Sequence, residues 1–167
     1  MIYLDYQATT PLASEALAAM QPWLVTGFAN PHSSHRLGRA AAAAVEVARD
    51  QVAALLPPGG RVIFTSGASE AINLALKGSL AHVERPVIAA SAIEHAAVLD
   101  TARYVARRGE MHVLAVDSQG LVDPMAALPD GLGLLAVMHV NNEIGTIQPV
   151  AELAARASPP LPPGEGR

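Results

Sequence analysis

Three short polar clusters in this sequence combine residue types that could bind and activate a ligand. They are Ser66–Glu70, the pair Glu94-His95, and His139–Glu143, and each follows a run of apolar residues. A histidine exchanges protons near neutral pH, an asparagine both donates and accepts hydrogen bonds, and small residues at a helix start bring free amides against an anion. Such a set of groups would suit an anionic, planar ligand.

The first cluster has the composition of a phosphate-binding helix start. Gly67 is expected to allow a tight turn, and Ala68 and Ser69 are small enough for their backbone amides to approach an anion. The Ser69 hydroxyl could add a hydrogen bond. The alternative is an ordinary helix start capped by Ser66 or Ser69. A Walker loop is excluded because the pattern GxxxxGK[ST] is absent.

The histidines and Asn142 each allow a functional and a structural interpretation. His95 stands at the predicted start of a helix, where it could lie on a planar ligand and exchange protons, or simply cap the helix. Asn142 could contact a phenolate or carboxylate, or form a turn. The pair His32 and His35 favours a loop or helix cap over a metal site, because no carboxylate or cysteine cluster accompanies it.

The elements that would position these clusters alternate between strands and helices. Continuous apolar runs predict buried strands, and apolar residues at three- and four-residue spacing predict helices. This alternation indicates an α/β fold with a mostly parallel sheet flanked by helices, although it does not give the strand order. Ligands of such sheets bind at the carboxyl ends of the strands, so the three clusters are expected in one site. The predicted strands are 61–65, 86–90, 111–116 and 134–138, and the predicted helical segments are 36–56, 72–80, 98–108, 124–128 and 150–157.

Composition narrows the classes of function. The 167 residues carry a net charge of −4 with no cluster of Lys and Arg, which argues against binding to nucleic acid. No apolar stretch approaches the roughly 20 residues of a membrane span, and no signal peptide is recognisable, so we expect a cytoplasmic protein. Because the chain has no cysteine, sulfur chemistry would need a thiol from elsewhere. The Pro-rich residues 158–167 are expected to be disordered.

Five motifs in order resemble the cysteine desulfurases, members of the fold-type I, aminotransferase class V group of pyridoxal-phosphate enzymes. The resemblance runs from Tyr3 to Ala157, so residues 1–157 would be the amino-terminal part of the major domain and 158–167 a tail. The motifs are Tyr3–Pro11, Asn30–His35, Phe64–Ala75, Glu94–Leu99 and Met138–Gly145.

The resemblance implies a role for each candidate residue. Ala68 and Ser69 would hold the phosphate of pyridoxal phosphate, with Ser69 standing where the family commonly has threonine. His95 would stack on the pyridine ring and assist proton transfers, and Asn142 would contact the hydroxyl side of the ring. The implied reaction takes sulfur from L-cysteine as a persulfide on a mobile-loop cysteine and leaves alanine. A homodimer and a sulfur-acceptor or scaffold protein, in iron-sulfur cluster or thio-cofactor assembly, are also implied.

The sequence departs from the family pattern after Ala157. The Schiff-base lysine, the aspartate that pairs with the pyridine nitrogen, the substrate-binding arginine and the loop cysteine have no counterpart here. We therefore expect little or no desulfurase activity from this chain alone, and we interpret it as a truncated or frameshifted sequence. The alternatives are another class V enzyme, such as a selenocysteine lyase, or a non-catalytic remnant that pairs with a full-length subunit.

Overall fold

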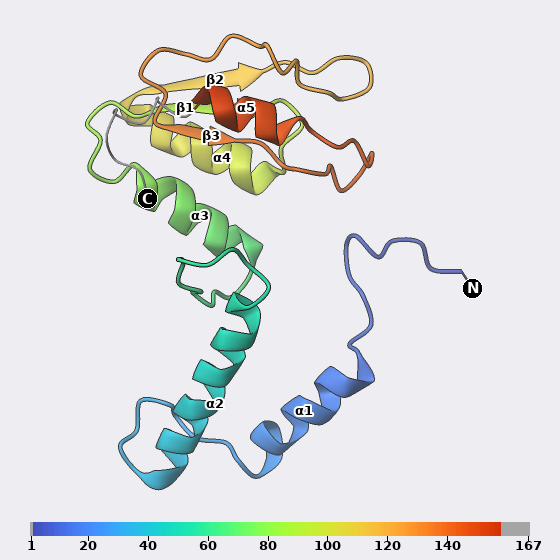
Figure 1. Cartoon of the computed structure of the whole chain (residues 1–167), viewed down its shortest axis with the longest axis vertical. Helices are drawn as coiled ribbons and strands as arrows, with labels where there is room; N and C mark the ends of the chain where they lie inside the picture. Colours follow the sequence, from blue (N-terminus) through green and yellow to red (C-terminus); the bar gives the residue numbers. More distant parts are fainter. Residues whose placement is uncertain (1, 158–167) are drawn as a thin grey trace. The chain divides into compact units, whose positions relative to one another are not determined.

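A computed structural model of the chain describes residues 2–157 and divides it into two compact units, Met1–Phe64 and Thr65–Arg167. Figure 1 shows the order of the elements along the chain. The predicted disordered tail, residues 158–167, lies outside the described residues. Among the described residues no helix is both long and apolar enough to span a membrane.

A three-stranded parallel sheet forms the centre of the second unit. Its strands are β1 (Val87–Ser91), β2 (Glu110–Leu114) and β3 (Leu134–Ala136), in the order β2-β1-β3. Both pairings are parallel, with Ile88 opposite Met111 on one side and Leu134 on the other. The central strand is almost wholly buried, as its continuous apolar sequence predicted. Three of the four predicted strands are therefore confirmed.

Helices cover both faces of this sheet. Because successive strand residues point to opposite faces, Ile88 packs beneath α3 (Ala68–Ser79) and α4 (Ala96–Val105), and Ala89 faces α5 (Val150–Ala157). These helices confirm the predicted helical segments near 72–80, 98–108 and 150–157. One core cluster comprises Leu76, Leu80, Ile88, Val98, Ala102 and Val105, and the other comprises Ala89, Leu114, Val122 and Leu153.

The two helices on the first face run in the same direction. The Lys77 ammonium, near the end of α3, lies 4.6 Å from the centre of the Tyr104 ring, near the end of α4. Arg108, in the short 3₁₀ turn Ala106–Arg108 that continues α4, donates a hydrogen bond to the Leu80 carbonyl (3.3 Å). Since their carboxyl ends meet, the first turns of α3 and α4 lie at the same end of this layer (Figure 1).

Two predicted elements are wrong. Residues 61–65 do not form a strand, and the side chains of Ile63 and Phe64 are 63% and 49% exposed. A strand needs a neighbouring strand whose backbone groups bond to its own. The central strand β1 cannot provide these bonds to residues 61–65, because it is already paired with β2 and β3. Residues 124–128 form a turn instead of a helix, because the Asp123 carboxylate accepts from the Met125 amide (2.8 Å) and Pro129 disfavours a helical Leu128.

The first unit consists of two helices and extended segments. Helix α1 (Ser14–Val25) was not predicted, and it contains Pro22, a residue that usually argues against a helix interior. Helix α2 (Arg36–Ala53) confirms the predicted helix 36–56. His35 is its N-cap, with Nδ1 accepting a hydrogen bond from the Gly38 amide (3.1 Å), which confirms the capping interpretation of this histidine.

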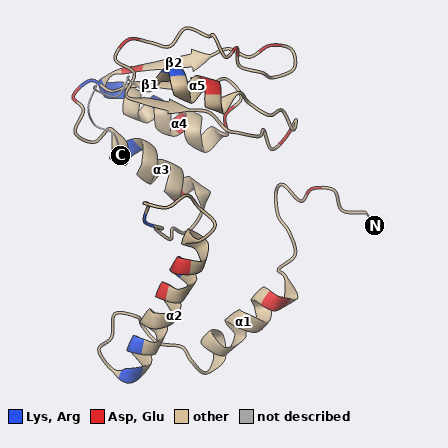
Figure 2. Cartoon of the chain, in the orientation of Figure 1, with Lys and Arg blue, Asp and Glu red and all other residues tan. Residues whose placement is uncertain are grey.

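The charges of α2 are arranged against its dipole. Figure 2 shows basic residues at its start and acidic residues further along, and the sequence assigns these to Arg36, Arg39, Glu46 and Asp50. Acidic groups are favoured at the start of a helix and basic groups at its end, so this order is unfavourable. The alanine run 40–44 compensates, because alanine has the highest helix propensity.

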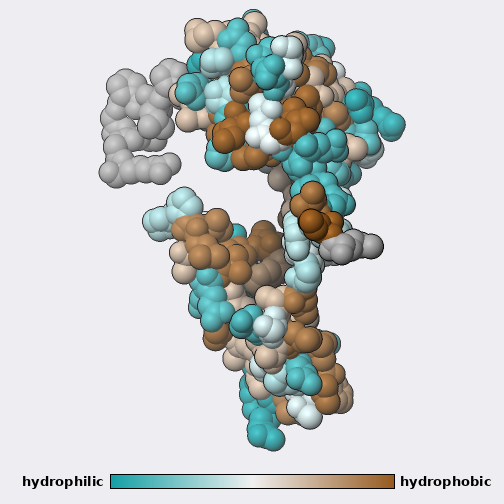
Figure 3. All heavy atoms as spheres, turned by 90° about the vertical axis from the view of Figure 1, so that its right-hand side faces the viewer, coloured by the Kyte–Doolittle hydropathy of each residue, from teal (hydrophilic) through white to brown (hydrophobic). Residues whose placement is uncertain are grey.

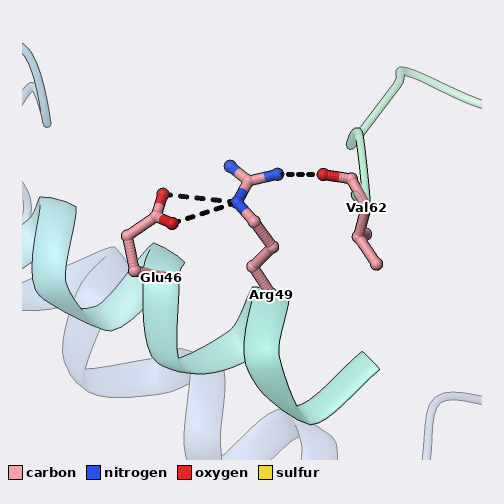
Figure 4. A network of polar contacts seen from close by, with 3 residues as sticks. All are labelled: Glu46, Arg49 and Val62. Atoms are coloured by element: carbon pink, nitrogen blue, oxygen red, sulfur yellow. Dashed lines mark hydrogen bonds and ion pairs between the residues drawn. The ribbon is translucent and has the colours of Figure 1, made fainter. Parts of the chain in front are cut away.

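Arg49 holds the extended segment after α2. Its Nε bonds to both carboxylate oxygens of Glu46 (3.2 and 3.3 Å), and Nη1 donates to the Val62 carbonyl at 2.6 Å (Figure 4). The guanidinium also lies 4.9 Å from the centre of the Phe64 ring. One side chain thus satisfies a backbone carbonyl that a neighbouring strand would otherwise bond.

The first unit exposes much of its apolar surface. Only Gly38 and Ala41 are buried among its described residues. Figure 3 shows hydrophobic atoms on its surface. A largely apolar pocket of about 710 Å³ lies between α1 and α2 and is lined by Trp23, Phe28 and twelve further residues. The unit therefore lacks an enclosed core of its own.

Candidate functional site

The loops that follow β1 and β3 form one pocket. These strands are parallel neighbours, so their carboxyl ends lie at the same edge of the sheet. The pocket has a volume of about 390 Å³, and the structure brings His95 and Asn142 together in its lining. The complete lining is Ile93, Glu94, His95, Ala96, Asn141, Asn142, Glu143 and Ile144.

His95 is an exposed side chain at the start of α4. It is the N-cap residue, and its Nδ1 accepts a hydrogen bond from the Ala97 amide (3.0 Å). The predicted capping role is therefore present. Because Nδ1 acts as an acceptor, the neutral imidazole carries its proton on Nε2. Nε2–H can donate a hydrogen bond to a ligand while the cap is kept, whereas taking up a proton at Nε2 would require Nδ1 to release the Ala97 amide.

Asn142 is exposed, and the residue before it is buried. The Asn141 Oδ1 accepts hydrogen bonds from the amides of Glu143 (2.9 Å) and Ile144 (3.0 Å), which shapes the loop that carries Asn142. Gly145 follows with a positive φ of 74°, a conformation that favours glycine. Sequence reasoning did not single out Asn141. The available signal was an asparagine a few residues before a glycine, which is typical of a side-chain-closed turn.

Glu94 is a second site residue that sequence reasoning assigned no role of its own. It is only 8% exposed, and its Oε1 accepts from the Ser91 hydroxyl (2.8 Å) and the Met138 amide (2.6 Å). A buried carboxylate is costly unless hydrogen bonds satisfy it, so these contacts indicate a structural purpose. The available signal was an acidic residue directly after a buried strand.

Ala68 and Ser69 are exposed at the first turn of α3. No side-chain hydrogen bond caps this helix at its N-cap residue, Gly67. Their turn lies at the same end of the helical layer as His95, but neither residue lines the His95 pocket. The chain bends at Ser66 and Gly67, where the turn was expected, but Gly67 itself is extended, with φ of 165° and ψ of 179°, and an added Cβ would meet nothing within 4 Å.

Ser66 does not cap α3, as one of the two interpretations predicted, but donates to a carboxylate in the first turn of the helix. Glu70 Oε2 accepts hydrogen bonds from both the amide and the hydroxyl of Ser66, each at 2.6 Å. Both bonds lower the pKa of the Glu70 carboxyl from its usual value, and the bond from the Ser66 hydroxyl has the larger effect. A negative charge in this turn also suits the helix dipole. Ser66 therefore participates as a donor to Glu70.

This lowered pKa predicts a pH dependence of stability. A carboxyl whose pKa is lower in the folded state contributes stability above its unfolded pKa, and that contribution is lost as the pH falls through the folded value. We expect Glu70→Gln to remove this part of the acid-induced loss, and Ser66→Ala to reduce it. Urea unfolding followed by circular dichroism at several acidic pH values measures the effect. Parallel pH profiles for the wild type and Glu70→Gln would contradict it.

A family model described as aminotransferase class V matches residues 2–159. A cysteine desulfurase IscS from Dictyoglomus turgidum (strain DSM 6724 / Z-1310) is 43% identical over 161 residues, which cover 92% of this chain and 41% of the relative. A cysteine desulfurase IscS from Dechloromonas aromatica (strain RCB) is 46% identical over 162 residues, covering 91% of this chain and 40% of the relative. The chain thus spans about two fifths of the length of these relatives.

Solved structures show the same fold. A NifS-like protein superimposes with a TM-score of 0.85 at 34% identity, covering 93% of this chain and 45% of that one. A structure described as SspA in complex with cysteine gives a TM-score of 0.84 at 34% identity, covering 93% and 47%. The predicted α/β class, as part of a fold-type I large domain, is confirmed by these similarities together with the parallel sheet.

Proposed function

Since this chain belongs to the aminotransferase class V family, we propose that it carries ring-binding and phosphate-binding residues of a pyridoxal-phosphate-dependent cysteine desulfurase. Such an enzyme removes sulfur from L-cysteine and leaves alanine. The observation that carries the proposal is the shared pocket of His95 and Asn142 at the carboxyl ends of β1 and β3. Relatives named cysteine desulfurase at 43% and 46% identity support the choice of reaction.

The residues at this end of the second unit fit pyridoxal phosphate in kind. His95 offers an exposed flat ring, and Asn142 offers a carboxamide for the ring hydroxyl. The uncapped start of α3 suits a phosphate, which Ala68 and Ser69 would hold through backbone amides and the Ser69 hydroxyl. The open space beside Gly67 leaves room for a group larger than a methyl. When bound, the cofactor supplies an electron sink for the substrate.

His95 is the proposed catalytic residue of this chain. With Nδ1 accepting from the Ala97 amide, Nε2–H would donate a hydrogen bond to the ligand; Nε2 would accept the proton that moves during the reaction once Nδ1 has released the Ala97 amide and carries the ring proton itself. Asn142 would orient the ring by a hydrogen bond from its carboxamide. Both groups stand on loops fixed to a buried strand, an arrangement that favours a constant geometry.

The wider biochemical setting is also part of the proposal. Residues 1–157 would form the amino-terminal part of the large domain of a homodimer, and the exposed apolar side chains of the first unit support such pairing. A sulfur-acceptor or scaffold protein would receive the sulfur for iron-sulfur cluster or thio-cofactor assembly. A cytoplasmic location is consistent with this chemistry, because the cytosol keeps thiols reduced.

Binding of pyridoxine 5′-phosphate, the alcohol analogue that lacks the reactive aldehyde, tests the site directly. We expect His95→Ala and Asn142→Ala each to weaken binding by about tenfold, the effect of one good stacking or hydrogen-bonding contact. His112→Ala is the matched control, because His112 is exposed on β2 and does not line the pocket. Isothermal titration calorimetry measures the dissociation constants. No binding to the wild type, or equal losses in all three variants, would refute the proposal.

A further inference from the structure

Two buried polar side chains join the loop after β1 to the loop after β3. Glu94, on the first loop, accepts a hydrogen bond from the Met138 amide on the second (2.6 Å). Asn141, on the second loop, donates from Nδ2 to the Ile93 carbonyl on the first (3.1 Å). The two bonds run in opposite directions between the same two loops, and we call them the Glu94–Asn141 clasp.

The Glu94 side of the clasp is a charged acceptor in a buried place. One oxygen, Oε1, accepts from both the Met138 amide and the Ser91 hydroxyl, and Ser91 is fully buried at the end of β1. Hydrogen bonds to an ionised acceptor are about twice as strong as neutral ones. Glu94 therefore fixes the start of the second loop to the end of the central strand.

The Asn141 side of the clasp uses both ends of one carboxamide. Its Nδ2 is bonded to the Ile93 carbonyl, and its Oδ1 is bonded to the amides of Glu143 and Ile144. Asn141 is 7% exposed. A buried carboxamide with its donor and acceptor both used leaves one arrangement of the two loops fully satisfied.

Each member of the clasp directly precedes a candidate ligand-binding residue. Glu94 is followed by His95, and Asn141 is followed by Asn142; the first residue of each pair is buried and the second is exposed. All four line the same pocket. Movement of one loop relative to the other would therefore change the spacing between the imidazole and the carboxamide.

We propose that Glu94 and Asn141 are positioning residues, which set the separation of His95 and Asn142 and thereby the fit of the pyridine ring. The proposal rests on the proposed function for its ligand, although the spacing of the loops can be measured without one. Neither residue needs to touch the ligand. We therefore expect the affinity for the ligand to depend on two hydrogen bonds whose partners are 44 and 48 residues apart in the sequence.

The absence of cysteine from the sequence makes the loop spacing measurable. Nitroxide labels on Ala96→Cys and Glu143→Cys would sit on opposite sides of the pocket, on exposed residues. Continuous-wave electron paramagnetic resonance then reports their separation through dipolar broadening. In the otherwise unchanged chain we expect one narrow distribution of distances.

Substitutions in the clasp should widen that distribution. Glu94→Met keeps the size of the side chain but loses both acceptor bonds, whereas Glu94→Gln keeps an oxygen that can accept from the Met138 amide. Asn141→Asp keeps Oδ1 for the Glu143 and Ile144 amides but loses the donor to Ile93. We expect a wide distribution for Glu94→Met and Asn141→Asp and a narrow one for Glu94→Gln.

Binding of pyridoxine 5′-phosphate by unlabelled chains supplies the second measurement. We expect Glu94→Met to weaken binding by about tenfold and Glu94→Gln by less than about threefold. Leu153→Ala is the control for a general loss of stability, because Leu153 is fully buried on the opposite face of the sheet. It should destabilise the fold and leave both the distances and the affinity of the folded protein unchanged.

The outcomes separate this inference from the proposed function. If the wild type does not bind the analogue but the clasp variants widen the distances, the function fails and the spacing role stands. If the wild type binds and the folded Glu94→Met chain keeps both the narrow distances and the affinity, the positioning role is overturned. Should Glu94→Met not fold, Asn141→Asp decides the question by the same two readouts.

Discussion

Replacing Gly109 with alanine is expected to lower the free energy of unfolding of the second unit by about 3 kcal/mol or more, as overpacking against rigid atoms does. A Cβ on this residue would lie 2.0 Å from the Pro86 carbonyl oxygen and 2.7 Å from the Pro86 nitrogen. Both are backbone atoms. The same carbonyl accepts the Glu110 amide at 2.9 Å, where β1 and β2 begin to pair, so it cannot move away without loss of that bond.

Urea unfolding followed by circular dichroism measures this effect, with Gly78→Ala as the matched control. Gly78 lies inside α3, and an added Cβ there would meet nothing within 4 Å. Alanine in an open helical position is favoured over glycine, so this variant should be more stable by about 0.5–1 kcal/mol. Equal stabilities for the two variants would show that Gly109 is not constrained as the structure implies.

Leu76→Ala is expected to destabilise the second unit by about 2–5 kcal/mol, the range for truncation of a buried leucine. Leu76 is 6% exposed and packs in the cluster formed by α3, α4 and the sheet. Its removal leaves a cavity between the two helices that carry Ser69 and His95. The loss should therefore appear both in the urea midpoint and in weaker binding of pyridoxine 5′-phosphate.

Leu74→Ala provides the comparison, because Leu74 lies on the same helix with 51% of its surface exposed. The change in helix propensity is the same at both positions, so the difference between the variants isolates packing. We expect Leu74→Ala to cost about 1 kcal/mol or less. A similar cost for both substitutions would mean that α3 is not packed on the sheet through Leu76.

The sequence predicted those elements whose signal is local. The strands β1 and β3 come from continuous apolar runs, β2 overlaps a mostly apolar run interrupted by His112, and α2 has apolar residues at helical spacing. Elements that depend on distant partners were not predicted correctly. Residues 61–65 have the composition of a strand but no neighbouring strand among the described residues. Helix α1 was missed for a local reason, since it contains Pro22, which usually argues against a helix interior.

The residues of the candidate site also differ in whether local sequence was enough to identify them. His95 and Asn142 were identified because reactive side chains directly after apolar strands are informative on their own. Glu94 and Asn141 were given no role, because a polar residue is recognised as structural only when its buried partner is known. Those partners, Met138 and Ile93, lie 44 and 48 residues away in the sequence.

The position of Lys77 affects how this chain must be handled with aldehydes. It is the only lysine in the sequence, and its ammonium lies on the Tyr104 ring where α3 and α4 end, away from the helix starts near His95. Reductive trapping with borohydride could therefore fix pyridoxal to the wrong end of the helical layer. A fluorescent covalent product would then report the chemistry of a surface amine, and Lys77→Arg would leave the amino terminus as the only competing amine.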